Sequence, residues 1–251
     1  MPIAVPVQII PATTPTPTSP GGTSPGPAPG GRSGTSGPDT LRGNGGADLI
    51  FGLGGPDSIF GLTGNDSLYG GDGDDSLQGD AGNDILFGGA GRDSVLGGIG
   101  DDTFYGGKGS DSVSGDEGND LLFGNQDADT LLGGAGNDTF FGGAGDDSLF
   151  GGDGDDCLSG DLGRDTLTGG AGNDTFAIGR QADGDVITDF TETDQIRLTA
   201  GLTFGELTIS AGAGNSPTTI IQLTSTKEIL ATLFGVARAS ITQADFIIGN
   251  G

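Results

Sequence analysis

Fifteen aspartates recur nine residues apart through the middle of the chain, a density of carboxylates that points to cation binding. They are Asp48, Asp57, Asp66, Asp75, Asp84, Asp93, Asp102, Asp111, Asp120, Asp129, Asp138, Asp147, Asp156, Asp165 and Asp174. Calcium takes six to eight oxygen ligands, from carboxylates and backbone carbonyls. Aspartate also caps turns without metal, but a column of carboxylates with no counterion would repel itself. We therefore expect bound cations.

These aspartates occupy position six of a nonapeptide written fifteen times over residues 43–177 without insertion or deletion. Position one is always Gly, position eight is always Ile, Leu, Val or Phe, and position four is Gly except at Asp127. We expect positions one to six to turn and positions seven to nine to form a short strand whose position eight points inward. A fixed period predicts that each repeat stacks on its neighbours.

The pattern resembles G-G-x-G-x-D-x-U-x, the RTX or hemolysin-type calcium-binding repeat of secreted toxins, proteases and lipases. The resemblance covers the fifteen copies and implies an all-β fold, a right-handed parallel β-roll with two nonapeptides per coil. Fifteen copies would then form about seven and a half coils, roughly 35 Å long. A small β-rich cap is expected to follow.

The same resemblance implies the ligand set. Each Ca²⁺ ion would lie between turns i and i+2, held by both aspartates, by carbonyls of positions two and four of one turn, and by carbonyls of positions one and three of the other. Examples are the carbonyls of Gly70, Gly71, Asp72, Gly73, Gly88, Gly89, Ala90, Gly91, Gly133, Gly134, Ala135, Gly136, Gly151, Gly152, Asp153 and Gly154. Fifteen turns offer thirteen such pairs, so up to about thirteen ions are expected.

The composition excludes several classes of function. With 35 acidic and 9 basic residues the formal charge is −26, which leaves no basic surface for nucleic acid. There is no histidine, so neither a zinc protease motif nor a histidine-dependent hydrolase is possible, and we predict no enzymatic activity. The single cysteine excludes an intramolecular disulfide.

Residues 1–42 hold ten of the twelve prolines among Thr, Ser and Gly, which predicts a disordered, partly polyproline-like extension. The segment has no basic residue before Arg32 and no small-residue cleavage site, so a cleaved secretory signal is not expected. No apolar run approaches the ~18 residues of a membrane span. The β-roll is placed at residues 43–178.

Residues 179–251 form the predicted cap and secretion-signal region. Strands are expected in residues 185–190, 194–198, 202–209, 218–223 and 228–236, and a helical turn in residues 240–246 capped by Ser240 or Thr242. The block supplies apolar residues to cover the last open edge of the roll. The ending Asp245-Phe246-Ile247-Ile248 resembles the uncleaved C-terminal signal of type I secretion substrates, followed here by Gly249-Asn250-Gly251.

Position nine of alternate repeats carries six aromatic residues, which we name the stripe: Phe51, Tyr69, Phe87, Tyr105, Phe123 and Phe141. Stacked strands would bring these rings together, where they would support one another. The other interpretation is a docking surface for a cell-surface or extracellular partner, or for the terminal segments, because contiguous apolar surface commonly marks contact sites.

The sequence therefore predicts a secreted, non-enzymatic calcium-binding protein of structural or adhesive kind, exported by a type I exporter and folded by calcium outside the cell. One alternative is an accessory module for a separate secreted enzyme. A second is an ice-binding roll, which would need outward Thr and Asn ladders; position three offers only Thr63, and position five offers Asn in a few copies such as Asn65, Asn83, Asn137 and Asn173.

Overall fold

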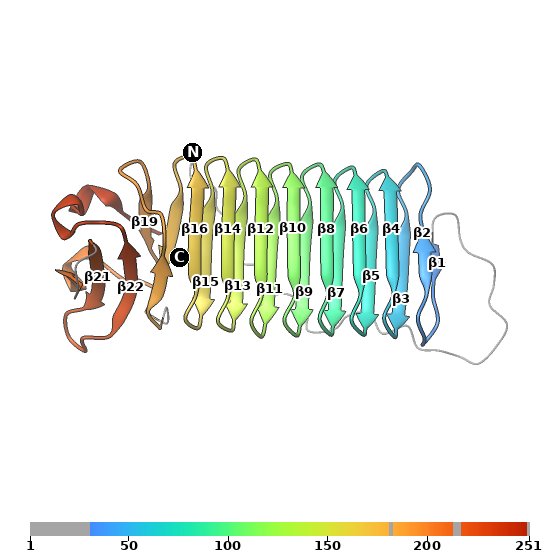
Figure 1. The fold of residues 1–251 in the computed structure, drawn as a ribbon, viewed down its shortest axis with the longest axis horizontal. Coiled ribbons are helices and arrows are strands. Elements are labelled where there is room, and N and C mark those ends of the chain that lie inside the picture. The colour runs from blue at the N-terminus through green and yellow to red at the C-terminus, as the bar shows by residue number, and fades with distance from the viewer. Residues whose placement is uncertain (1–30, 181–182, 213–216, 250–251) are drawn as a thin grey trace.

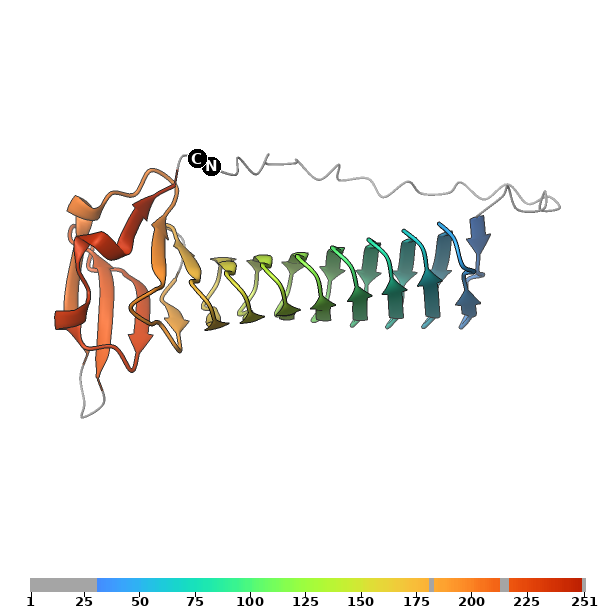
Figure 2. The same cartoon turned by 90° about the horizontal axis from the view of Figure 1, so that it is seen from above.

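The computed structural model describes residues 31–180, 183–212 and 217–249, and these form a parallel β-roll closed at its C-terminal end by a small cap (Figure 1). Strands stack side by side along the long axis of the roll, and seen from above they form two facing sheets (Figure 2). No helix in the described ranges is long and apolar enough to cross a membrane.

Odd-numbered strands of the roll form a sheet that has eleven strands in the described part of the chain. In spatial order they are β1 (Gly31–Ser33), β3 (Leu49–Gly54), β5 (Ser67–Asp72), β7 (Ile85–Ala90), β9 (Thr103–Lys108), β11 (Leu121–Gln126), β13 (Thr139–Ala144), β15 (Cys157–Leu162), β17 (Thr175–Ile178), β19 (Gln195–Leu198) and β23 (Phe246–Ile248).

Even-numbered strands form the facing sheet, of twelve strands in the same described ranges. They are β2 (Thr40–Arg42), β4 (Ser58–Thr63), β6 (Ser76–Ala81), β8 (Ser94–Ile99), β10 (Ser112–Glu117), β12 (Thr130–Ala135), β14 (Ser148–Asp153), β16 (Thr166–Ala171), β18 (Asp185–Ile187), β22 (Ile229–Phe234), β21 (Thr218–Leu223) and β20 (Leu207–Ala211). Strands two apart in sequence pair in parallel and in register, as with Leu68 opposite Leu86. Every coil thus repeats the one before it.

The strands are longer than the sequence indicated. Each regular strand has six residues, covering positions seven to nine of one repeat and positions one to three of the next, so only positions four to six turn. The expectation of a six-residue turn rested on the glycines at positions one and four, and for positions one to three it was wrong. Position one lies within the strand, and positions two and three pair in register, as with Gly71 opposite Gly89.

The roll also begins earlier than residue 43. Strands β1 and β2 pair with β3 and β4, and they add a coil within the segment for which we expected disorder. Residues 34–42 follow the repeat at its key positions, with Gly34, Gly37, Asp39 and Leu41 at positions one, four, six and eight. The remainder of the predicted extension, residues 1–30, lies outside the described residues.

The interior of the roll is a single column of apolar side chains, one for each repeat. Position eight is buried in all fifteen copies, from Ile50 to Phe176, because strand alternation turns it toward the facing sheet. Position one is buried as well, but it carries only glycine, so the two sheets approach each other closely. The apolar core therefore amounts to one side chain per nine residues.

The cap extends both sheets of the roll and adds an apolar core of its own. β19 and β23 continue one sheet, while β18 and β22 continue the other, where β22, β21 and β20 then pair antiparallel. Short 3₁₀ turns lie at Phe204–Glu206, Arg238–Ser240 and Gln243–Asp245, the last capped by Thr242 as the sequence predicted. Folded in this way, the cap covers the C-terminal edge of the roll.

Candidate metal centre

All fifteen repeat aspartates are buried, although carboxylates are seldom found in protein interiors. Their Oδ1 atoms are satisfied in one repeating way. The backbone N–H of Asp84 donates to Asp102 Oδ1 at 2.7 Å, and that of Asp102 donates to Asp120 Oδ1 at 2.8 Å. Each carboxylate thus binds the aspartate backbone one coil earlier in the sequence and fixes the spacing of the coils.

The second oxygen of these carboxylates has no such partner. Thirteen Oδ2 atoms, from Asp57 to Asp165, are buried without a hydrogen-bond partner among the described residues. Leaving a buried polar group unsatisfied costs about 1–3 kcal/mol, and more for a charged group. A bound cation would provide the interaction that this row of buried oxygens lacks.

Glycine at position one provides the space around these oxygens. A Cβ added at Gly70 would come closer than 3.0 Å to both Asp75 Oδ2 and the Gly88 carbonyl oxygen, and the same overlap recurs along the column. None of the position-one glycines has a positive φ. Glycine is therefore required at position one because oxygens converge beside it, and not because of a left-handed backbone.

The left-handed backbone lies instead at positions two and four. From the second copy on, both positions have positive φ: position four is glycine with φ between 85° and 151°, or Asp127 with φ 71°. Position two also has positive φ, yet it accepts side chains, as at Leu53 (φ 84°) and Asn125 (φ 82°). Such conformations favour glycine because it lacks a Cβ. The two bends turn successive carbonyl groups in different directions.

The predicted carbonyl ligands fall into groups by position. Those of position one, in Gly70, Gly88, Gly133 and Gly151, converge with an Asp Oδ2 of the preceding coil. Those of positions two and four, in Gly71, Gly73, Gly89, Gly91, Gly134, Gly136, Gly152 and Gly154, lie against the glycine at the same position one coil on. Those of position three, in Asp72, Ala90, Ala135 and Asp153, accept the N–H of a position-four residue one coil earlier.

Burial makes these carboxylates reluctant to ionise without a cation. It raises the pKa of Asp102 and of Asp120 to about 7 and that of Asp84 to about 6, although the backbone N–H bonds act in the opposite direction. Neighbouring carboxylates raise the pKa further. No three acidic or cysteine side chains cluster within the described ranges, so the oxygen set combines carboxylate pairs with backbone carbonyls.

Three members of the column were missed by our reading of the repeats. Asp39 in the early coil donates its N–H to Asp57 Oδ1 at 2.8 Å. In the cap, Asp185 and Asp194 are buried and accept the N–H groups of Asp165 and Asp174 at 3.1 and 2.9 Å. The triplets Asp185-Val186-Ile187 and Asp194-Gln195-Ile196 keep positions six to eight of the repeat after a two-residue insertion, and they were the available signal.

Position five points into solvent on both edges of the roll. On one edge, asparagines and aspartates accept backbone N–H groups from coil to coil, as Asn119 Oδ1 does from Asn137 at 2.9 Å. Asn119 is thus one more asparagine of this ladder, but position three beside it holds Ala81, Ile99 and Glu117, not a threonine row. On the other edge Arg92 pairs with Asp74 at 2.9 Å, away from the buried carboxylates.

The stripe forms a continuous stack on the outer face of the eleven-stranded sheet. Ring centroids of successive members lie 4.6–5.1 Å apart, and their planes differ by 2–20°. This spacing equals that of the strands, so the rings support one another as expected for stacked strands. The stack ends where Phe141 meets Ser159 on β15.

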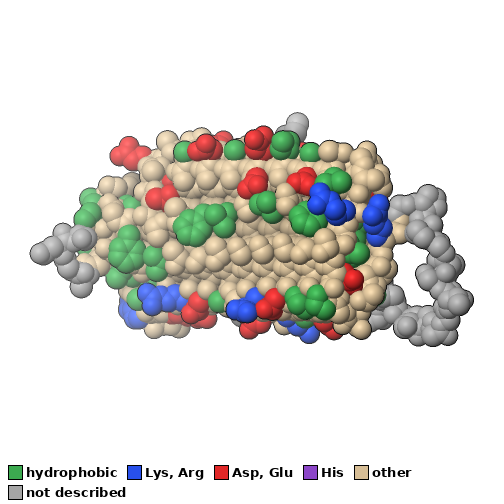
Figure 3. Space-filling model, turned by 45° about the vertical axis from the view of Figure 1, so that its right-hand side comes forward, with side chains coloured by type: hydrophobic (Ala, Val, Ile, Leu, Met, Phe, Trp, Pro, Cys, Tyr) green, Lys and Arg blue, Asp and Glu red, His purple; other side chains and the backbone are tan. Residues whose placement is uncertain are grey.

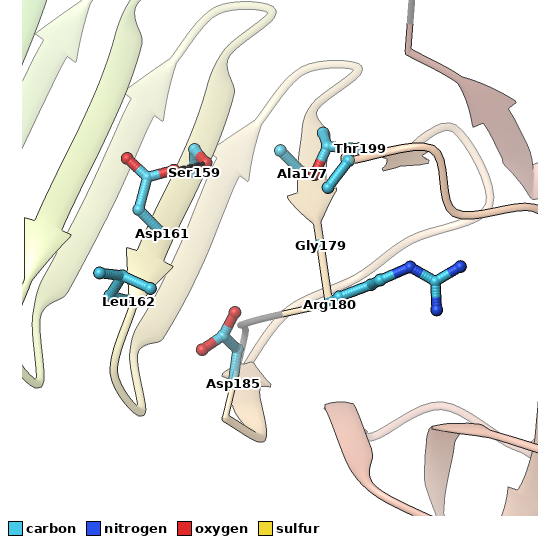
Figure 4. A pocket seen from close by; sticks show the side chains of 9 residues that line it. Ser159, Asp161, Leu162, Ala177, Gly179, Arg180, Asp185 and Thr199 are labelled. Carbon is cyan, nitrogen blue, oxygen red and sulfur yellow. Dashed lines mark hydrogen bonds between the residues drawn. The ribbon is translucent and has the colours of Figure 1, made fainter. Parts of the chain in front are cut away.

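Beyond the stripe, the junction between roll and cap has a pocket of about 560 Å³ (Figure 4). Ser159 and Ala177 replace the aromatic rings there, and Ser159 donates to Asp161 Oδ1 at 2.7 Å. Arg180 also lines the pocket, but its guanidinium is paired with Glu206 of the cap at 2.5 Å. The pocket therefore marks where the repeat register gives way to the cap.

Solved structures that are similar to this chain include a subunit of an epimerase and a lipase. The AlgE6R3 subunit of the Azotobacter vinelandii mannuronan C5-epimerase is 29% identical, with 48% of this chain and 78% of that chain covered and a TM-score of 0.40. The extracellular lipase LipA of Serratia marcescens is 20% identical, with 86% of this chain and 40% of that chain covered and a TM-score of 0.29. No curated protein matches the chain.

A sequence model of the RTX calcium-binding nonapeptide repeat matches residues 33–59, 60–95, 96–131, 123–158, 132–167 and 151–184. Together these segments span more than half of the chain, and they include the early coil around Asp39 as well as the fifteen regular copies. RTX repeats bind calcium in general, and the stacked buried carboxylates and the parallel β-roll fit that property. The chain belongs to the RTX calcium-binding nonapeptide repeat family.

Proposed function

We propose that this chain binds Ca²⁺ between successive coils of the roll and that this binding drives its folding. The observation that carries the proposal is the row of thirteen buried Oδ2 atoms without a partner. Each lies beside a position-one glycine and, from Asp57 to Asp156, also beside a backbone carbonyl of the next coil. Hard oxygens of this kind, carboxylate and carbonyl together, match the preference of Ca²⁺.

Each ion would be held by two aspartates of neighbouring coils, such as Asp84 and Asp102, together with carbonyls of the turns that precede them. The fifteen regular turns would bind up to about thirteen ions, and thirteen divalent ions would carry +26 against the chain's −26. When bound, calcium supplies the positive charge that the buried carboxylates require. The chain supplies the spacing, because each Oδ1 is already fixed by a backbone N–H.

Folding would then depend on the calcium concentration. Taking a dissociation constant of ~10⁻⁴ M, typical of extracellular calcium modules, occupancy is ~0.1% at ~10⁻⁷ M calcium and ~90% at ~1 mM. Each occupied site would add ~1.4 kcal/mol at ~1 mM. Summed over many sites this exceeds the ~5–15 kcal/mol net stability of a typical domain. The chain would be unfolded at cytosolic calcium and folded outside the cell.

This dependence supports a secreted protein that leaves the cell unfolded through a type I exporter and folds on arrival. The acidic-then-apolar ending Asp245–Ile248 supports that route by its resemblance to type I signals. Because the aspartates would all be occupied by calcium, the folded roll would have a structural or adhesive role and no enzymatic one. The folded cap would complete the rod at its C-terminal end.

Isothermal titration calorimetry on the calcium-stripped full chain tests the proposal. We expect uptake of many Ca²⁺ ions per chain at millimolar calcium, together with a gain of β signal in circular dichroism. Mg²⁺ is the control, because it keeps its own water and prefers a stricter octahedral site. Absence of multi-ion uptake, or β structure that persists unchanged in EGTA, would contradict the proposal.

A further inference from the structure

On the outer face of the eleven-stranded sheet, a band from position seven to position two of the repeat carries no charge over six consecutive strands, although the chain as a whole has a charge of −26. The charged residues Asp72 and Lys108 follow at position three, at the edge of this band. Outward side chains of β3, β5, β7, β9, β11 and β13 come from positions seven, nine and two of the repeat, eighteen residues in all, and none is acidic or basic. We name this surface the stripe face. Leu49, Leu53 and Ile85 on it are large exposed apolar residues.

The facing sheet does not share this property. At the same three positions it holds Asp80 and Asp116, and its position-nine column alternates between apolar and polar residues, as in Leu96 and Ser114. Acidic side chains of the roll also gather along its long edges, as the view of one side in Figure 3 shows. Of the two sheet faces of the roll, the stripe face is thus the one that combines apolar character with lack of charge from position seven to position two.

The stripe face has a ridge and a furrow that run side by side along the roll. The ridge is the stripe at position nine. Two residues further along each strand, position two is glycine at Gly71, Gly89, Gly107 and Gly143, where no side chain rises from the sheet, and Leu53 on β3 and Asn125 on β11 interrupt this furrow. Two such faces related by a twofold axis parallel to the roll would place each ridge in the furrow of the other, which makes the face complementary to itself.

The area of the face is close to what a dimer needs. Six strands at ~4.8 Å spacing and the five residues from position seven to position two at ~3.3 Å give a flat surface of roughly 475 Å² per copy, or about 950 Å² for two. A specific interface needs about 1,000 Å², and apolar composition without buried charge is typical of homodimers. Since the face is uncharged, two copies could approach here without juxtaposing carboxylates.

We propose that the stripe face is covered by a second copy of this chain, with the two rolls parallel and each stripe packed into the partner's glycine furrow. This inference rests on the proposed function in one respect, which is that the roll must be folded before its face exists. Bound calcium would favour association further, because it neutralises the acidic interior and so reduces repulsion between the copies.

Sedimentation velocity of the full chain in calcium, with reducing agent to keep Cys157 from crosslinking, measures the assembly. We expect a concentration-dependent species of twice the 24.6 kDa chain mass. The test variant is Thr103→Arg, which places a charge at position seven of the stripe face beside the stripe without removing a ring. The matched control is Ser112→Arg, the same position on the facing sheet.

Two unpaired guanidinium groups buried in the interface should raise the dimer dissociation constant of Thr103→Arg roughly 100-fold or more, while Ser112→Arg leaves it unchanged. Circular dichroism and calcium uptake of each sample report separately on folding, so a failure of the proposed function would appear there. The dimer is contradicted if the folded, calcium-loaded wild type is monomeric at every concentration. This holds even if a lipid surface or another protein is then found to cover the face. Equal weakening by both variants overturns it too.

Discussion

The roll and the cap have opposite interiors, although their sheets are continuous. The roll buries fifteen apolar side chains between Ile50 and Phe176, each accompanied by a buried aspartate. In the described part of the cap, thirteen apolar side chains between Ile178 and Ile241 are buried over about half as many residues, and the aspartate column ends at Asp194. The cap resembles an ordinary small core, whereas the roll encloses a line of negative charge.

Two parallel sheets can enclose a row of carboxylates if an interaction other than apolar packing stabilises them. Burial of a charge without a counterion is among the most costly events in folding. In the roll that cost recurs every nine residues, and one apolar side chain per repeat does not offset it. In the cap, Phe190, Leu202 and Leu230 pack as they would in any β domain.

Calcium removal should therefore separate the two regions. In EGTA we expect backbone amides of residues 43–177 to lose protection from hydrogen exchange by several orders of magnitude, while amides of β21 and β22 in the cap keep more of theirs. The reason is that, under the proposed function, the interior of the roll would depend on cations, whereas the core of the cap is mainly apolar. Peptide-resolved hydrogen exchange with mass spectrometry measures both regions in one sample, and equal loss in the two would remove the distinction.

Acid should partly replace calcium in the roll. The pKa values of Asp102 and Asp120 are raised to about 7 in the folded chain from 3.8, chiefly by burial. A raised folded pKa means that the folded state binds the proton more tightly, so this stabilisation is present below pH ~4 and is lost as the pH rises through 6 to 7.

We therefore expect the calcium-stripped chain to gain β structure when the pH falls from 7.5 to 4, as followed by circular dichroism. With calcium present, lowering the pH should weaken calcium binding, because protons compete with Ca²⁺ for the same carboxylate oxygens. A calcium-free chain whose spectrum stays constant over this range would show that the carboxylates do not limit folding.

A cavity in the narrow core of the roll should be costly even when calcium is saturating. Phe140 at position eight is fully buried, and Phe140→Ala should lower the free energy of unfolding by about 3–5 kcal/mol. Phe150→Ala is the matched control, because Phe150 lies at an outward position nine and is 41% exposed. Chemical denaturation in calcium compares them, and similar losses in both variants would mean that the position-eight column is not the core.

Single carboxylates of the column should have smaller effects. Asp102→Asn keeps an Oδ1 acceptor for the Asp84 N–H but removes the charge, so we expect the loss of one or two calcium ions and about 1–3 kcal/mol of stability in millimolar calcium. Asp101→Asn, one residue earlier, changes an exposed ladder member and should leave calcium uptake intact. Calorimetry of the pair distinguishes a ligand from a surface charge.

Much of the roll was predictable because its period is strict. The inward position eight, the stacking of repeats and the ring stack of the stripe all follow from residue types such as Leu68 and Tyr69 recurring at fixed spacing. The length of the strands did not follow, because glycine weakens strands in general, and Gly71 pairs only because identical coils lie on both sides. The sequence likewise does not explain why position one is always glycine. The structure explains it, because Oδ2 of Asp75 lies beside Gly70 and leaves no room for a Cβ.

The ends of the roll were predicted less well than its middle. Asp39 was passed over because its surroundings are rich in proline and glycine, a composition typical of disorder, although the positions of the repeat are present. Asp185 and Asp194 were passed over because a two-residue insertion breaks the period while the pairing continues. The coils do not need an exact nine-residue spacing. A turn that is two residues longer still returns the chain to the same hydrogen-bond register.

The backbone-to-carboxylate links give the roll a direction. Every donor N–H belongs to the earlier aspartate and every acceptor to the later one, and the last two acceptors, Asp185 and Asp194, belong to the cap. Shortening the rod from its amino end would leave every surviving donor with its acceptor. Shortening it from the carboxyl end would strip the acceptors from two donors at each new terminus, so a rod of any chosen length has to keep its tail.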